Sequence, residues 1–367
     1  MALPSSAPAL EPVEQPVSAA AVPVAAAEHR YPVEFTATAG EYFRIWIVNL
    51  ALTIVTLSIY SAWAKVRKRR YFYGHTRIAG EGLEYRAPPI AILKGRLIAT
   101  ALLAVFFVGG RFIPGLDLEG LTGKAVFSVV GVFVGPWLLV RSFKFNAYHT
   151  AYRNVRLRFI GTYKTCVAVV IRYVWYLLLG FGYPVFRHRL VEYVAQNHAY
   201  GTTQFEVLDF KKPFTRPYWV AYATGLAFAF AAGVALPMTA GTAGEKPPAP
   251  PFLFVFLLYL AFIPLFAYVR ARTTNAVWNN TRVGPARFEC TLRGRDFVWL
   301  YFTNALAVVF TLGFATPWAV IRMLRYRARK FSVVAAGPLD GFVPAEGESV
   351  GAAGEEMAAL FDFDIAL

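Results

Sequence analysis

The residues of this chain whose types and spacing could do chemistry are arginines and aromatic side chains that follow apolar runs. The pattern Arg-x-x-Arg-Tyr occurs at 67–71 and at 322–326, each time shortly after a tryptophan. Arginines at i and i+3 lie on one helix face, so both can contact the same phosphate group. Tryptophan and tyrosine prefer the headgroup level of a bilayer. These patterns therefore predict either a specific anion site or general lipid anchoring. Two looser copies of this pattern follow Pro136 and Pro184. Together, the four copies give the candidate residues Arg67, Arg70, Tyr71, Arg141, Lys144, Arg189, Arg322, Arg325 and Tyr326.

Three polar residues inside apolar runs are a second set of candidates. Asn49 and Asn304 occupy the same position in two copies of a repeated phrase, and Arg172 lies within one residue of that position in a third. Polar side chains at membrane depth mark ligand paths, but asparagine also hydrogen-bonds between helices and arginine also extends to the headgroups. Both interpretations stay open. Carboxylates are nearly absent from these runs, which argues against a proton-driven pump.

Metal, cofactor and enzyme signals are absent from the sequence. The five histidines and two cysteines form no CxxC, HExxH or similar ligand spacing, and there is no GxSxG or P-loop pattern. We expect no metal, no cofactor and no enzymatic activity. Cys166 and Cys290 are interpreted as small apolar fillers.

The composition is that of a membrane protein. Hydrophobic residues are 57% of the 367 residues, and the mean hydropathy is +0.45. Residues 43–330 contain 36 of the 37 basic residues and 10 of the 22 acidic ones. Because these basic residues flank apolar runs, they favour anionic lipid headgroups over nucleic acid as the partner. Protein partners cannot be named from the sequence. The chain divides into an Ala- and Pro-rich disordered head (1–30), a repeat-containing membrane domain (31–333) and an acidic disordered tail (334–367).

One unit recurs along the membrane domain. It consists of an apolar helix, a break at Pro-Trp or Trp, the basic aromatic phrase, and a polar turn into a short extended piece such as 82–85 or 286–289. Proline cannot continue a helix hydrogen-bond ladder, so it ends or kinks the apolar helix at the break.

These repeats resemble the YjgN-like bacterial inner-membrane proteins, a family defined by a domain of unknown function. The resemblance covers about residues 31–333 and implies a polytopic inner-membrane protein with no established activity. The first copy departs from the family pattern at Ser58 and Ala62, where Gly and Pro are expected. The residues that match the pattern are Thr56-Leu57, Trp63-Ala64, Arg67, Arg70-Tyr71, His75-Thr76, Trp278-Asn279-Asn280-Thr281-Arg282, Leu300-Tyr301, Asn304, Thr311-Leu312-Gly313, Pro317-Trp318, Arg322 and Arg325-Tyr326.

Seven apolar segments permit two topologies. If all seven cross the membrane with the N-terminus outside, the inner loops carry 19 Lys and Arg and the outer segments 14. If instead 43–64, 166–186 and 297–320 lie in the interface or dip in and return, the cytoplasmic loops carry 29 and the outer loops 3. The positive-inside rule favours the second topology, whereas the length of the last segment favours the first. The segments are 43–64, 92–113, 121–140, 166–186, 218–240, 250–269 and 297–320.

The sequence therefore predicts an all-α polytopic membrane protein with internal repeats. It would have four to seven transmembrane helices, and some segments would be re-entrant or interfacial. We expect a multi-pass protein of the bacterial inner membrane that binds or transports a small or lipid-like solute, because broken helices recur in transporters. The alternative is a structural or envelope-organising protein without transport activity.

Overall fold

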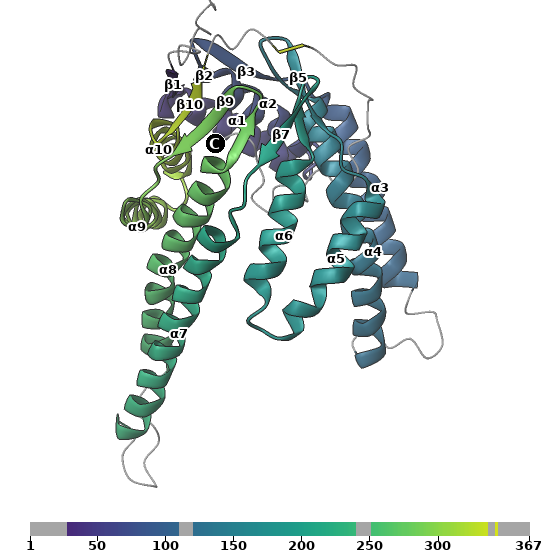
Figure 1. The fold of residues 1–367 in the computed structure, drawn as a ribbon. Coiled ribbons are helices and arrows are strands. Elements are labelled where there is room, and N and C mark those ends of the chain that lie inside the picture. The colour runs from purple at the N-terminus through teal and green to yellow at the C-terminus, as the bar shows by residue number, and fades with distance from the viewer. Residues whose placement is uncertain (1–27, 110–119, 240–250, 337–341, 344–367) are drawn as a thin grey trace, which may run out of the picture.

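The computed structural model describes residues 28–109, 120–239, 251–336 and 342–343. This part of the chain contains ten strands and ten helices, and the helices occur in consecutive pairs (Figure 1). The strands are β1 (His29–Phe35), β2 (Thr76–Ile78), β3 (Glu81–Tyr85), β4 (Thr150–Tyr152), β5 (Val155–Phe159), β6 (His198–Tyr200), β7 (Thr203–Val207), β8 (Thr281–Val283), β9 (Ala286–Cys290) and β10 (Phe331–Ala335). The helices are α1 (Ala39–Val55), α2 (Ser61–Gly74), α3 (Pro89–Gly109), α4 (Leu121–Tyr148), α5 (Tyr163–Leu178), α6 (Tyr183–Gln196), α7 (Lys211–Thr239), α8 (Pro251–Asn279), α9 (Gly294–Phe310) and α10 (Thr316–Arg329).

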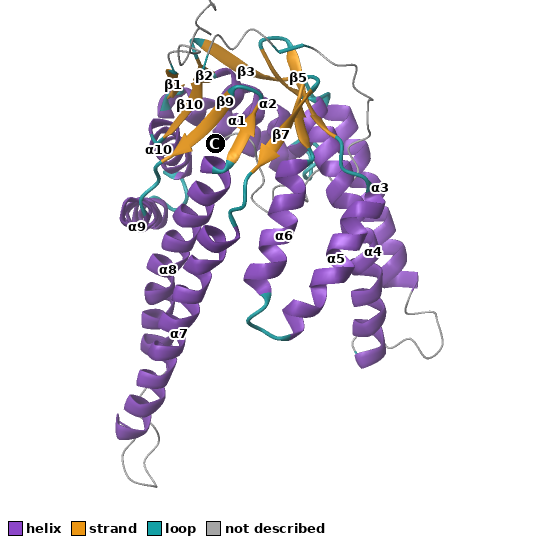
Figure 2. Cartoon of the chain, in the orientation of Figure 1, coloured by secondary structure: helices purple, strands orange, loops and turns teal. Residues whose placement is uncertain are grey.

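The ten strands form one antiparallel sheet that closes on itself. Each strand pairs with its neighbours in the chain, and β1 pairs with β10, with His29 opposite Ala335. The interior is lined by apolar side chains such as Val33, Leu157 and Val333, all buried. We call this element the closed sheet. The pairs α3–α4, α5–α6 and α7–α8 run down from it in the view of Figure 2, and α3–α4 and α7–α8 are the longest pairs.

The architecture is one arrangement repeated five times. In each unit a strand leads into two helices, and the second helix leads into the neighbouring strand, so that unit 1 is β1-α1-α2-β2 and unit 5 is β9-α9-α10-β10. One backbone hydrogen bond recurs at the base of every unit, where the first residue after the first strand donates to the last residue before the second. These bonds run from Thr36 N to His75 O (3.0 Å), Arg86 N to His149 O (2.8 Å), Ile160 N to Asn197 O (2.8 Å), Leu208 N to Asn280 O (2.9 Å) and Thr291 N to Lys330 O (2.9 Å).

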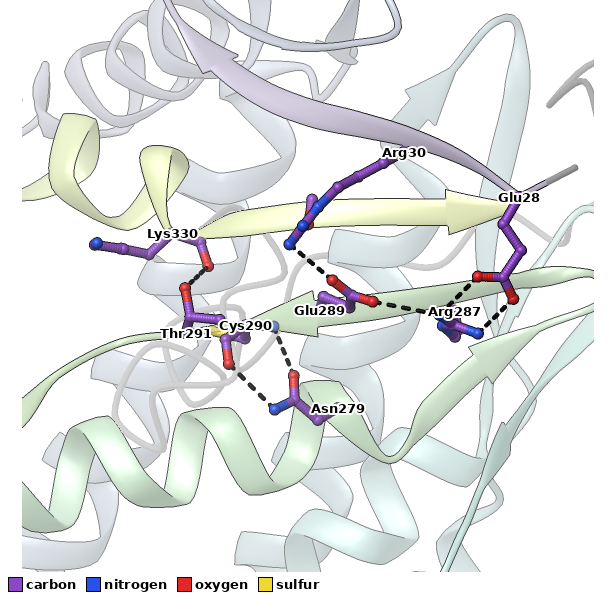
Figure 3. A network of polar contacts seen from close by, with 9 residues as sticks. Glu28, Arg30, Asn279, Arg287, Glu289, Cys290, Thr291 and Lys330 are labelled. Atoms are coloured by element: carbon purple, nitrogen blue, oxygen red, sulfur yellow. Dashed lines mark hydrogen bonds and ion pairs between the residues drawn. The ribbon is translucent and has the colours of Figure 1, made fainter. Parts of the chain in front are cut away.

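The first and last units are held together by a polar network beside the closure (Figure 3). Arg30 of β1 pairs with Glu289 of β9 at 2.7 Å, and Arg287 donates to Glu28 at 2.6 and 2.9 Å. The Asn279 amide donates to Cys290 O and accepts from Cys290 N, which ties α8 to β9. The ion pairs are exposed and contribute little to stability, so the backbone pairing of β1 with β10 dominates the closure.

The three short helix pairs turn at equivalent sequences, which we call the tips: 56–60 in unit 1, 179–182 in unit 3 and 311–315 in unit 5. In units 1 and 5 a threonine organises the turn. The Thr311 hydroxyl donates to Ala307 O (2.7 Å) and accepts from Ala315 N (2.8 Å), and Thr56 makes the same two bonds. The next residues are left-handed, with φ of 50° at Leu312 and 95° at Gly313. The repeated Thr-Leu phrase is therefore a turn signal.

Below the sheet, each first helix contributes one buried side chain at the same place. The residue seven positions after the end of the first strand is at most 3% exposed in all five units, because it packs where the two helices meet the sheet. These residues are Tyr42, Ile92, Cys166, Phe214 and Phe297.

The prediction of an all-α polytopic membrane protein is wrong. The ten strands form a closed sheet, and as far as their described residues extend, none of the helices combines the length and apolar character that a bilayer crossing requires. Both charge-based topologies assumed such crossings and are not retained, and the multi-pass arrangement has no support here. The segments 43–64, 166–186 and 297–320 each fold back at a tip into two helices.

The short extended pieces were the correct part of the secondary-structure prediction. The predicted pieces 82–85 and 286–289 lie in β3 and β9. The closed sheet also extends beyond the boundaries drawn at 31 and 333, since β1 begins at His29 and β10 ends at Ala335. Most of the predicted head and tail lies outside the described residues.

Candidate anion-binding site

The basic aromatic phrases lie on the second helix of each unit, close to the sheet. The residue nine positions before the start of the following strand is arginine in all five units. An equivalent aromatic side chain lies four residues earlier in four of them. The five arginines are Arg67, Arg141, Arg189, Arg272 and Arg322.

The tyrosine of the phrase holds the start of the first helix in its own unit. Tyr326 Oη accepts a hydrogen bond from Arg293 N (3.1 Å) and donates to Asp296 (3.0 Å). Tyr71 does the same with Thr38 N (3.1 Å) and Glu41 (3.0 Å). Burial, with the nearby carboxylate, raises the pKa of Tyr326 to about 12, so the phenol keeps its proton. Both predicted tyrosines are therefore engaged in helix capping.

The second arginine of the phrase joins one unit to the next. Arg70 Nη2 donates to Ala87 O of unit 2 at 3.3 Å, and Arg325 Nη2 donates to Ala37 O of unit 1 at 3.0 Å. In unit 4 the equivalent residue is Asn275, which donates to Leu292 O at 2.9 Å. One donor of each guanidinium is thus used within the protein, which leaves further N–H groups for a ligand because arginine has five.

Two grooves open along equivalent faces of α10 and α8. The unit 5 groove, of about 320 Å³, is lined by Trp318, Arg322, Arg325 and Arg329 of α10, which lie on one face at helical spacing. It also includes Ala39 of unit 1 and therefore lies at the junction of two units. No acidic side chain belongs to the described lining of this groove.

The unit 4 groove, of about 420 Å³, uses the same helix positions with different residues. Tyr268, Arg272, Asn275 and Asn279 of α8 replace the four residues of α10, and Arg216 of α7 adds a second cation. The Arg272 guanidinium lies 5.8 Å from the Tyr268 ring, as Arg322 lies 5.1 Å from the Trp318 ring. Both grooves thus combine an arginine on an aromatic face with further hydrogen-bond donors, which suits a phosphate group.

The remaining candidates lie at the equivalent positions of units 1 to 3. Arg67 is exposed on α2, and Arg141 and Lys144 are half-buried on α4, with Arg141 5.4 Å from the Trp137 ring. Arg189 is neutralised locally, because it donates to Glu192 at 2.7 Å. Of the two grooves, the one in unit 5 therefore contains more cationic side chains.

The three polar candidates are not brought together. Asn304 is buried between α9 and α10, where it accepts from Arg322 (3.0 Å) and donates to Ala319 O (3.3 Å). Asn49 is buried on α1, and Arg172 is exposed on α5. None of these three residues lines the grooves or cavities described here. The positions of Asn49, Arg172 and Asn304 give no support to a shared polar path.

Comparison with known proteins identifies the family of this chain. The family described as "Bacterial protein of unknown function (DUF898)" matches residues 30–360. The chain belongs to this family. Inner membrane protein YjgN of Salmonella typhimurium is 30% identical over 135 residues, which is 36% of this chain and 32% of the relative. The protein of the same name in Escherichia coli is 37% identical over 126 residues, 34% of this chain and 30% of the relative. No solved structure matches the chain.

The predicted resemblance to YjgN-like proteins is confirmed, and the names of these inner-membrane relatives support an inner-membrane location for this DUF898 chain. Its matches span about a third of the length of these relatives. In the described part of the chain, no three His, Cys, Asp or Glu side chains gather as a metal site would require. Both cysteines are buried and unbridged, and burial raises the pKa of the Cys166 thiol to about 12.

Sequence reasoning missed one basic cluster in this DUF898 chain. Arg187, Arg270 and Arg327 come from α6, α8 and α10 and line a single cavity beneath the closed sheet. Arg187 and Arg270 lie eleven residues before the next strand, and Arg327 lies four before it. Positions seven apart share a helix face, so this spacing was the available signal that the three side chains face the same interior.

Proposed function

We propose that the protein binds anionic lipid headgroups at the surface of the inner membrane, through the arginine grooves of units 4 and 5. The observation that carries this proposal is the unit 5 groove. Three arginines and a tryptophan share one face there, with no carboxylate in the described lining. Guanidinium groups bind phosphate oxygens in pairs, and tryptophan prefers the interface, so a phospholipid headgroup matches both chemistries.

The exposed tips supply the apolar half of this contact. Leu57 and Leu312 are each 89% exposed, and Phe310 beside the third tip is 80% exposed. Side chains this apolar are seldom displayed together on a protein that meets only water. The long helix pair α7–α8 also carries exposed apolar groups, among them Leu226 and Phe230.

The spacing between tip and groove fits the thickness of a headgroup layer. A helix rises about 1.5 Å per residue, so Arg322 lies about 9 Å and Arg325 about 14 Å along α10 from its first residue, Thr316. Apolar faces of interfacial helices are buried about 5–10 Å into the boundary between headgroups and acyl chains. Tips inserted to that depth would place the arginines beside the phosphates.

The size of the effect is modest for each residue. A basic side chain near an anionic leaflet contributes about 1 kcal/mol, so Arg322, Arg325 and Arg329 together contribute about 3 kcal/mol, or roughly a hundredfold in affinity. This term weakens with salt, because charges in an open groove are screened over about 10 Å at 0.1 M ionic strength.

One observation also favours the alternative function, that of a structural or envelope-organising protein. Arg70 and Arg325 tie successive units together through backbone carbonyls, so part of the basic phrase maintains the assembly of the protein itself. An envelope-organising protein without transport would use the same lipid contacts as an anchor. Transport of a solute is not part of our proposal, because the polar residues that would line a path lie apart.

The test compares lipid retention by the full chain and two matched double variants. Arg272→Gln with Arg329→Gln removes one exposed cation from each groove, whereas Arg77→Gln with Arg282→Gln removes two exposed cations from the strands. Anionic phospholipid retained per purified chain is counted by mass spectrometry. The proposal predicts that the groove variant loses at least half of the retained phosphatidylglycerol and the strand variant none. Equal retention by both variants would contradict it.

A further inference from the structure

A cavity of about 130 Å³ lies inside the closed sheet. Each of the ten strands contributes at least one side chain to its lining, among them Val33 of β1, Leu157 of β5 and Val333 of β10. The cavity is therefore the interior of the closed sheet and belongs to no single unit. An engineered apolar cavity of about 150 Å³ stays dry and binds benzene, so this space has the size of one aromatic ring.

The lining of this cavity is apolar. No charged side chain belongs to the described lining, and its three hydroxyl groups all donate to backbone carbonyls of the protein. Thr76 Oγ1 donates to Phe72 O at 2.9 Å. Tyr152 Oη donates to Ile78 O, and Tyr200 Oη donates to Tyr152 O, both at 2.8 Å. A buried water needs about two to four polar partners, so this lining selects an uncharged apolar ligand.

Aromatic rings close the cavity on the side of the helices. The Trp278 ring lies edge-on to Phe288 at 5.1 Å and to Phe331 at 5.0 Å between ring centroids. Phe205 and Trp278 also line the separate cavity among α6, α7, α8 and α10. These rings form a wall between the two cavities, so a ligand reaches the interior of the closed sheet from the other end.

The other end carries the four hairpin turns, because every strand joins a helix at the end facing the aromatic wall. Two residues from beyond the sheet, Phe342 and Val343, lie across two of these turns. Thr202 N donates to Val343 O at 3.2 Å, and the Phe342 ring stands edge-on to the Tyr200 ring at 4.8 Å. At the β8–β9 turn, a Cβ added to Gly284 would lie 3.5 Å from the Phe342 ring. Phe342 therefore covers the end that the aromatic wall leaves open.

This cover is lightly held. The Phe342 ring lines the cavity, yet the residue is only half-buried, and the neighbouring Val343 is 61% exposed. Gly201 makes room for it, because a Cβ at that position would overlap Val343 O. The Phe342 ring belongs to neither the strands nor the helices, so it can leave the cavity without breaking the strand pairing.

We propose that the interior of the closed sheet is a binding site for one small uncharged apolar molecule, about the size of a substituted benzene ring, and that Phe342 is its movable cover. The strands supply the walls, the rings of Phe205 and Trp278 supply the floor, and Phe342 limits the length of the ligand. The site goes beyond the proposed headgroup binding, because it takes an uncharged ligand and shares no residue with the grooves of units 4 and 5.

The first test counts the fluorobenzene molecules bound to the purified full chain in an uncharged detergent by fluorine NMR. The probe also dissolves in the micelles, so the matched reference is Ala286→Leu. Ala286 lines the cavity and is 2% exposed, and a leucine there would fill the space. We expect one saturable fluorobenzene per natural chain and only the linear uptake of the micelles with the variant. Equal uptake by both chains would overturn the site.

A second filling variant guards against a folding defect in the first. Leu157→Phe fills the same cavity from β5 and should also abolish the saturable binding. Full saturable binding by a folded Leu157→Phe chain would overturn the assignment to the closed sheet. Phospholipid retention should be unchanged in both variants, so failure of the headgroup proposal is distinguishable from failure of this one.

Charged versions of the same ring test the apolar character of the site. 4-Fluorobenzoate and 4-fluorobenzylammonium should each bind at least tenfold more weakly than fluorobenzene, because the lining offers no partner to either charge. Either charged probe binding as tightly as fluorobenzene would overturn the ligand class.

A matched pair of neighbouring variants tests the cover. Phe342→Ala lengthens the cavity, so fluoronaphthalene should bind at least tenfold more tightly than it binds to the natural chain. Val343→Ala shortens an exposed side chain next to it and should leave the affinity for fluoronaphthalene unchanged. Equal affinities in the natural chain and in Phe342→Ala would overturn the role of Phe342 as the cover.

Two glycines give an independent test of the same role. Gly201 and Gly284 both have left-handed backbones, with φ of 59° and 52°, so alanine strains both turns alike. Only at Gly201 would the added Cβ overlap Val343 O and displace the segment. Gly201→Ala should therefore admit fluoronaphthalene as Phe342→Ala does, and Gly284→Ala should not. Equal affinities in the two glycine variants would show that the segment does not close the site.

Discussion

Replacing the two most exposed leucines separates membrane contact from folding. Leu57 and Leu312 are each 89% exposed, so neither contributes appreciably to the packed core. Both have left-handed backbones, with φ of 48° and 50°. Asparagine adopts this conformation more readily than leucine does. We therefore expect Leu57→Asn with Leu312→Asn to fold at least as stably as the natural chain.

The same double variant should bind membranes far more weakly. Burying one leucine side chain is worth about 1.5–3 kcal/mol, so two leucines inserted in the interface contribute about 3–6 kcal/mol. At 1.4 kcal/mol per factor of ten, the tip contribution to partitioning falls by about two to four orders of magnitude. Exposed substitutions change the free energy of unfolding by only about 0.5 kcal/mol. Membrane partitioning should therefore fall steeply while the free energy of unfolding stays nearly unchanged.

The assay is carbonate extraction of membranes that contain the full chain, with flotation of the extracted protein on phosphatidylglycerol vesicles. Leu57→Met with Leu312→Met is the control, because it keeps both side chains apolar. We expect the asparagine variant to be extracted at least partly and the methionine variant to stay with the membrane. If the asparagine variant is folded by circular dichroism and resists extraction like the natural chain, the tips do not carry the contact.

Three further predictions concern the turns, the caps and the buried histidine. Ser58→Gly should raise the free energy of unfolding by about 1 kcal/mol, because Ser58 has φ of 71° where the unit 5 tip has glycine, and Gly313→Ser should lower it similarly in thermal unfolding. Tyr326→Phe should cost about 1 kcal/mol in the same assay, because Arg293 N and Asp296 lose their partner. Burial lowers the pKa of His198 to about 4, below the value of about 6.5 in the unfolded chain. The contribution of neutral His198 to the free energy of unfolding is therefore complete above pH 6.5 and is lost as the pH falls from there through 4. This loss, about 3 kcal/mol, should disappear from the pH dependence of unfolding in His198→Phe, and an unchanged pH profile would contradict it.

The positions of the basic side chains could be predicted from the sequence, but the fold that presents them could not. Arginine nine residues before a strand recurs in all five units, and the phrase around it was visible in the sequence. The strands were harder to detect, because β2, β4, β6 and β8 have three residues each, too few to show the alternation of a strand. Closure depends on pairing His29 with Ala335, a contact that no local pattern signals.

The roles within the phrase also required the structure. The tyrosines Tyr71 and Tyr326 resembled interfacial anchors in sequence, yet their hydroxyl groups cap helices. Asn304 resembled a path-lining residue, but it bridges α9 and α10 through Arg322. Spacing alone places a side chain on a helix face, whereas its partner depends on which unit packs beside that face.

The depth of the tips is the most direct test of membrane contact by this protein. A spin label is placed at Leu312→Cys and, in a second variant, at Arg329→Cys, in the full chain reconstituted in phosphatidylglycerol bilayers. Both native cysteines are buried and should not react. Collision with oxygen should exceed collision with a water-soluble nickel complex at 312, with a depth of about 5–10 Å, and the reverse should hold at 329. Equal access of the nickel complex to both labels would show that the tips lie in water and would contradict the account.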